Sequence, residues 1–90
     1  MFETTQSAYQ VGAQLLIRTA TVYDTGRIVA VFPHELVLED ACWIPDTGRF
    51  SDALKACEFN EVEPFHRPVI VNRGGIIDAT YLDTLPTGQK

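Results

Sequence analysis

The sequence has 90 residues, of which 46% are hydrophobic and 21% are charged, and its net charge is −5. This length predicts one folded domain with a modest core, and the composition excludes a disordered chain. Seven basic residues, scattered among twelve acidic ones, argue against the basic face of a nonspecific nucleic-acid binder.

No apolar run approaches the roughly 20 residues that span a bilayer, and the first residues lack the basic and apolar regions of a secretory leader. We therefore expect no membrane partner, and either a cytoplasmic location or a place inside a virus particle. The two cysteines, Cys42 and Cys57, have no metal-ligand spacing. We expect them to be small apolar core residues. The sequence leaves open whether they pair.

The first half of the chain predicts a meander of three strands after a polar N-terminal arm at residues 1–10. Residues 13–23 are rich in apolar and β-branched side chains, and their imperfect alternation predicts a bent strand. Tyr23-Asp24-Thr25-Gly26 is a turn signal because glycine accepts positive φ. Residues 27–32 and 35–43 predict the next two strands. The short connections favour antiparallel pairing.

The second half predicts a helix-containing insertion at residues 44–67, followed by two further strands. Within the insertion, the apolar side chains of Phe50, Ala53, Leu54 and Cys57 have helical spacing. A helix this short must pack on the sheet. The acidic stretch after it, ending at Pro64, predicts a linker.

Residues 68–71 and 75–82 predict the fourth and fifth strands, and residues 85–90 predict a frayed tail. The whole chain is therefore predicted to be a single, mainly β domain. We expect a small five-stranded antiparallel barrel, with one short helix inserted between strands three and four.

Two segments resemble the two halves of the Sm motif of Sm-like and Hfq-like small barrels. The first half matches Gly26, the apolar run Ile28–Phe32 and the strand Leu36–Asp40; the second matches Val69–Ile77, around Arg73-Gly74. The resemblance implies an Sm-like or SH3-like barrel and a homo-oligomeric ring. The chain departs from the motif at Phe32-Pro33-His34-Glu35, where Sm proteins carry an aspartate and a base-contacting asparagine.

The chain is also similar to a family of small, uncharacterised phage and prophage proteins. The residues that carry this likeness are His34–Ala41, Trp43-Ile44, Asp46–Phe50 and Asn60–Pro64. It implies a viral context, in the host cytoplasm or in the virion, and a phage or host protein as a possible partner.

The candidate nucleic-acid site consists of the two turns that line the pore in Sm-like rings: Asn72, Arg73 and Gly74 in one, and His34 and Glu35 in the other. Glycine permits close approach of the backbone, and guanidinium suits phosphate. Glu35 would oppose RNA unless it paired with Arg73 of the same or a neighbouring chain. The alternative is a pair of ordinary solvated turns.

Four aromatic side chains in or beside the insertion are candidate interface residues: Trp43, Phe50, Phe59 and Phe65. Aromatic residues are enriched in subunit interfaces. The alternative is that the insertion covers one end of its own barrel.

We find no catalytic constellation, no metal-ligand set and no cofactor motif in this sequence. We therefore expect a non-catalytic, ring-forming protein with a structural or protein-interaction role. The competing hypothesis is a ring that binds single-stranded RNA through its pore. The net charge and the missing asparagine favour the first.

Overall fold

The computed structural model describes residues 7–90, so residues 1–6 of the predicted arm lie outside the described part. Within that part the chain forms six antiparallel strands, one α-helix and one 3-10 turn, which confirms a mainly β domain with one short helix. It includes no helix long and apolar enough to cross a membrane. The elements are β1 (Gln14–Thr19), β2 (Tyr23–Val31), β3 (Glu35–Asp46), α1 (Phe50–Ala56), β4 (Glu61–Pro64), β5 (Val69–Asn72), η1 (Arg73–Gly75) and β6 (Ile76–Tyr81).

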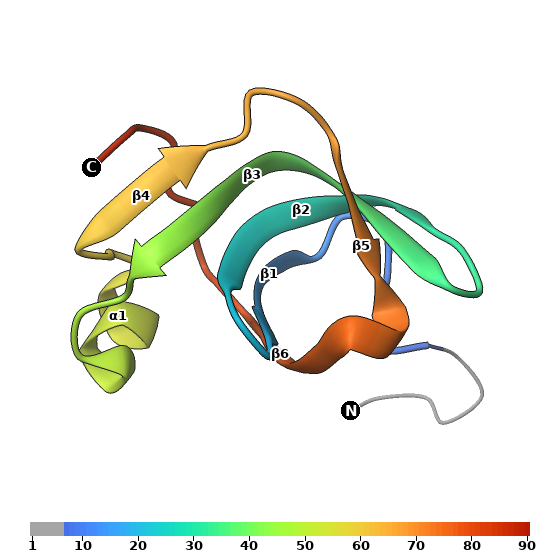
Figure 1. Cartoon of the computed structure of the whole chain (residues 1–90), viewed down its shortest axis with the longest axis horizontal. Helices are drawn as coiled ribbons and strands as arrows, with labels where there is room; N and C mark the ends of the chain where they lie inside the picture. The colour runs from blue at the N-terminus through green and yellow to red at the C-terminus, as the bar shows by residue number, and fades with distance from the viewer. Residues whose placement is uncertain (1–6) are drawn as a thin grey trace.

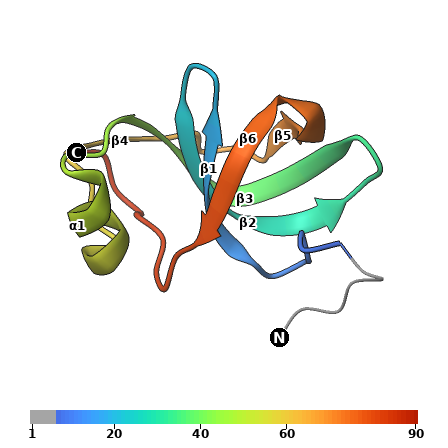
Figure 2. The same cartoon turned by 90° about the horizontal axis from the view of Figure 1, so that it is seen from below.

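All six strands belong to one sheet, in the order β4-β3-β2-β1-β6, with β5 also paired to β3. The central strand β3 is twelve residues long. It pairs with β2 on one side, while β5 and β4 share its other side, one on each half. Figures 1 and 2 show the sheet curled round, with η1 joining β5 to β6, the strand beyond β1. The predicted meander of the first three strands is confirmed.

The strand that the sequence does not predict is β4, which lies where we expected an acidic linker. Val62 is buried there, and Glu63 and Pro64 pair with Trp43 and Cys42 of β3. Pro64 is the last residue of the strand, where a missing backbone donor is tolerated. The strand forms because β3 continues to Asp46, beyond the predicted end, and needs a partner along its second half.

The predicted turn at Tyr23-Asp24-Thr25-Gly26 is wrong, because these residues open β2. The chain reverses earlier, and the Thr19 hydroxyl both accepts from the Val22 amide and donates to the Val22 carbonyl at 3.2 Å. These hydrogen bonds pair the backbone groups of the turn, so the turn forms without glycine. Gly26 is therefore needed for another reason.

Two hydrophobic clusters lie on opposite faces of the sheet. The inner cluster draws buried side chains from four strands and lies inside the curl: Leu15, Ile17, Ile28, Leu36, Leu38, Ala41 and Val71. The outer cluster lies between the sheet, α1 and the C-terminal segment: Leu16, Cys42, Ile44, Ala53, Cys57, Phe59, Val62 and Leu82. Alternate residues of β1 and of β3 therefore serve different clusters, as strand geometry requires.

The helix α1 confirms the predicted apolar stripe. Ala53 and Cys57 are buried in the outer cluster and Leu54 packs against it, while the Phe50 ring lies 5.8 Å from the Tyr23 ring. The helix ends at Ala56, because the next residue, its C-cap Cys57, has a left-handed φ of 55° that stops the helical repeat.

The sequence predicts a frayed tail at residues 85–90, but the C-terminal segment lies against β4. Lys90 and Val62 exchange both backbone hydrogen bonds, at 2.8 and 2.9 Å. Leu82 is buried in the outer cluster, and Leu85 packs against it. Two apolar anchors and a strand-like pairing therefore hold a segment whose Pro and Gly content suggested disorder.

Gly26 lets β3 approach β2 closely. A Cβ at this position would lie 3.0 Å from the Leu38 Cβ and 3.3 Å from the Ala41 Cβ. Both of those atoms are fixed to the β3 backbone, so they cannot move aside as the end of a flexible side chain can. The missing side chain is thus what allows the inner cluster to close at this point.

We expect Gly26→Ala to lower the free energy of unfolding by about 1–3 kcal/mol, because the added methyl overpacks the inner cluster. Urea unfolding followed by circular dichroism measures this. Gly74→Ala is the matched control, since no atom lies within 4 Å of its added Cβ. Equal stability of the two variants would contradict the close-packing argument.

Candidate functional site

The two turns predicted to form a nucleic-acid site lie side by side. The Arg73 backbone amide donates to the His34 carbonyl at 2.9 Å, and Glu35 is paired in register with Asn72. The pairing of β5 with the start of β3 positions both turns. The structure therefore brings together residues that lie nearly forty positions apart in the sequence.

The Arg73 guanidinium is held by contacts within the chain. It donates to the Phe32 carbonyl at 2.8 Å and to the Ser7 hydroxyl at 3.4 Å, and it lies 5.3 Å above the Tyr9 ring centre. The predicted ion pair with Glu35 of the same chain is not formed, because the guanidinium reaches the Phe32 carbonyl instead. A pair with Glu35 of a neighbouring chain stays a prediction.

The remaining residues of this site are accessible to a ligand. His34, Asn72 and Gly74 are exposed, and Glu35 is half-buried. A Cβ on Gly74 or Gly75 would meet no atom within 4 Å, so the backbone there can be approached closely. The site offers one cationic side chain, already engaged, beside one carboxylate. Because the carboxylate offsets the single cation, the site attracts phosphate only weakly.

Tyr9 is a contact that the sequence analysis did not find. Tyr9 packs against the inner cluster, and its ring faces the Arg73 guanidinium. The available signal was an isolated aromatic residue in a mostly polar segment, because a large apolar side chain is favoured where it can cover an apolar surface.

The four candidate interface aromatics separate into two groups. Trp43, Phe50 and Phe65 are 42%, 44% and 40% exposed, so each can still contact a partner. Phe59 is 2% exposed and lies in the outer cluster. Phe59 therefore stabilises its own chain and offers no interface surface. Its burial is what we expect from the alternative prediction, in which the insertion covers its own chain.

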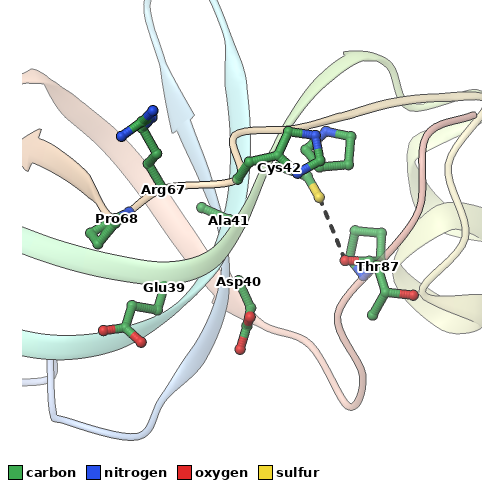
Figure 3. Close-up of a pocket in the computed structure, with 10 residues that line it drawn as sticks. Glu39, Asp40, Ala41, Cys42, Arg67, Pro68 and Thr87 are labelled. Atoms are coloured by element: carbon green, nitrogen blue, oxygen red, sulfur yellow. Dashed lines mark hydrogen bonds between the residues drawn. The ribbon is translucent and has the colours of Figure 1, made fainter.

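A cleft of about 370 Å³ lies between the middle of β3, the loop after β4 and the C-terminal segment. Figure 3 shows Arg67 on one side of the β3 ribbon and the Glu39 and Asp40 carboxylates on the other, so these charges do not converge on one point. The Cys42 thiol donates to the Pro86 carbonyl at 3.5 Å. Burial raises the pKa of this thiol, which makes it a poor nucleophile at neutral pH.

The residues that the structure describes include no group of three or more His, Cys, Asp or Glu side chains able to hold a metal ion. Cys42 and Cys57 are both buried as free thiols, in agreement with the predicted core role. Their shared place in the outer cluster explains their burial without a disulfide.

Asp24 is the second residue that sequence reasoning missed. It is 9% exposed, and burial raises the pKa of its carboxyl group. The signal was the alternation of Asp24, Gly26 and Ile28, which places all three on one face of a strand. Assignment of this segment to a turn concealed that pattern.

Comparison of the chain with protein-family models, with curated proteins and with solved structures finds no match.

We expect Asp24→Asn to raise the melting temperature at pH 7. Because the folded-state pKa is raised, the folded protein holds this proton more tightly than the unfolded chain does. The stabilising contribution is present below the ordinary pKa of about 4 and is lost as the pH rises through the folded-state pKa. Thermal unfolding at a series of pH values measures this, and the two proteins should converge below about pH 4. A difference independent of pH would show that the charge is not its cause.

Proposed function

We propose that this chain is a non-catalytic, Sm-like domain that assembles into a closed ring of identical copies and has a structural or protein-interaction role. The Sm-like resemblance of the sequence supports the finer description, a small barrel. The side chains in and against the inner cluster, which come from β1, β2, β3, β5 and β6, are consistent with that description.

The observation that carries the proposal is the pair of sheet edges on either side of η1. Among the residues described, β5 pairs with β3 alone and β6 with β1 alone. Ile70 on β5 is 72% exposed and Ile77 on β6 is 58% exposed. An unpaired strand edge with apolar side chains favours pairing with another chain. Pairing of β5 in one copy with β6 in the next gives a head-to-tail contact that can close into a ring.

The charge of the chain supports a protein partner. With a net charge of −5 per copy, a ring accumulates negative charge and repels phosphate at long range. A basic surface on a phage or host protein is complementary to it. The phage context comes from the sequence resemblance and is part of this proposal.

We expect the native mass in solution to be that of a discrete ring at moderate salt, where screening reduces repulsion between copies. Ile70→Glu and Ile77→Glu should each shift the protein to a monomer with an unchanged circular dichroism spectrum. Light scattering coupled to gel filtration measures both. Val11→Glu, at a residue that is 68% exposed, is the matched control and should leave the ring intact.

A wild-type protein that is monomeric at every salt concentration would contradict the ring. Equal effects of Val11→Glu and of the two strand-edge variants would show that added charge alone disperses the assembly.

A second candidate function is the binding of single-stranded RNA. The observation that favours it is the hydrogen bond between the Arg73 amide and the His34 carbonyl, which joins the two turns implicated by the Sm-like resemblance. The engagement of the guanidinium by Tyr9 and by the Phe32 carbonyl weighs against it.

We expect no binding of single-stranded RNA at high micromolar protein, because the one cation at this site is already engaged and the chain is acidic. Fluorescence anisotropy with labelled RNA at low and moderate salt measures this. Saturable binding that weakens with salt, is lost in Arg73→Ala and persists in the control Arg49→Ala would contradict our preference and establish the RNA function.

A further inference from the structure

A row of directly paired residues crosses the sheet near the hairpin between β1 and β2. Ile17 pairs with Asp24, Asp24 with Trp43, and Trp43 with Glu63. Directly opposed residues in antiparallel strands project to the same face. Because Ile17 belongs to the inner cluster, Asp24 and Trp43 lie on the inner face of the sheet.

Phe65 lies in the neighbouring row, on the same face of the sheet. Its backbone amide donates to the Ala41 carbonyl at 3.0 Å, which continues the pairing of β4 with β3 beyond Pro64. Phe65 is then the diagonal neighbour of Trp43, a distance that aromatic side chains span. Both rings are about two-fifths exposed. Both rings therefore lie on the same face of the sheet and remain accessible to a ligand.

In the described part of the chain, no cationic side chain lies over the ring of Trp43 or of Phe65. Within residues 7–90, the cation–π contact present is that of Arg73 over Tyr9. The aromatic faces here are therefore available to an external group.

Asp24 has no hydrogen-bond or ion-pair partner in the described part of the chain, although it is only 9% exposed. A buried carboxylate without a partner is destabilising, so proteins generally pair such groups or protonate them. The carboxylate is next to Trp43 in the register. A positive charge placed between them would satisfy both groups.

We propose that Asp24, Trp43 and Phe65 form a binding site for the cationic end of a lysine or arginine side chain of a partner protein. Tryptophan gives the strongest cation–π attraction, and desolvation strengthens it. A charge-assisted hydrogen bond to Asp24 then directs the cation inward. The net charge of −5 favours the approach of basic segments. This inference does not depend on ring assembly and holds equally for a monomer.

Trp43 is the one tryptophan of the sequence, so its fluorescence reports directly on this site. The experiment titrates the protein at pH 7 with n-butylammonium and with n-butylguanidinium, which copy the ends of lysine and arginine. The neutral control is n-butanol, and ionic strength is held constant. We expect saturable changes in emission with a dissociation constant on the order of millimolar for at least one of the cations. Their relative affinities identify the preferred side chain.

Asp24→Asn should weaken cation binding roughly tenfold, which corresponds to about 1.4 kcal/mol. This variant keeps the size of the side chain, and circular dichroism verifies its fold. Asp52→Asn is the matched control, since Asp52 is an exposed carboxylate on α1, and it should bind as the unmodified protein does. Phe65→Leu should weaken binding while retaining an apolar side chain.

Three outcomes would overturn the proposal. The first is an emission change that n-butanol reproduces. The second is the absence of saturation by either cation up to about 100 mM, far above the millimolar range expected. The third is unchanged cation affinity in Asp24→Asn, which would show that the buried carboxylate takes no part in binding the cation.

Discussion

The close approach of β3 to β2 at Gly26 is the constraint on which the rest of the structure depends. A Cβ at Gly26 would lie 3.0 Å from that of Leu38, so the two strands meet at this point without an intervening side chain. Ile28 and Leu38 are then fully buried in the inner cluster. The bent sheet leaves the second half of β3 on the side of α1, where a second cluster forms.

The length of β3 determines where the candidate functional residues lie. One strand pairs with β5 along its first half and with β4 along its second half. The first pairing brings Arg73 to His34, and the second brings Phe65 to Ala41. Both candidate surfaces therefore depend on the register of a single strand. A one-residue slip would move every side chain of β3 to the opposite face.

At Asp24, the proposed binding role and the stability of the strand oppose each other. A carboxyl group on the inner face of a strand is unfavourable unless it is protonated or paired. The neighbouring residues Ile17 and Ile28 follow the expected pattern of buried apolar side chains, so Asp24 is a local exception. Exceptions of this kind concentrate at functional sites, where binding of a partner compensates the cost.

The sequence by itself determined the mainly β class, the meander, the short helix and the buried cysteines, because these follow from local periodicity and from short connections. Only the tertiary structure decided the rest. The acidic segment at β4 forms a strand because it pairs with the second half of β3. The C-terminal segment is held against the sheet because Leu82 is buried in the outer cluster. The inward position of Asp24 and the engagement of Arg73 by Tyr9 depend on contacts between residues distant in sequence, which no local pattern specifies.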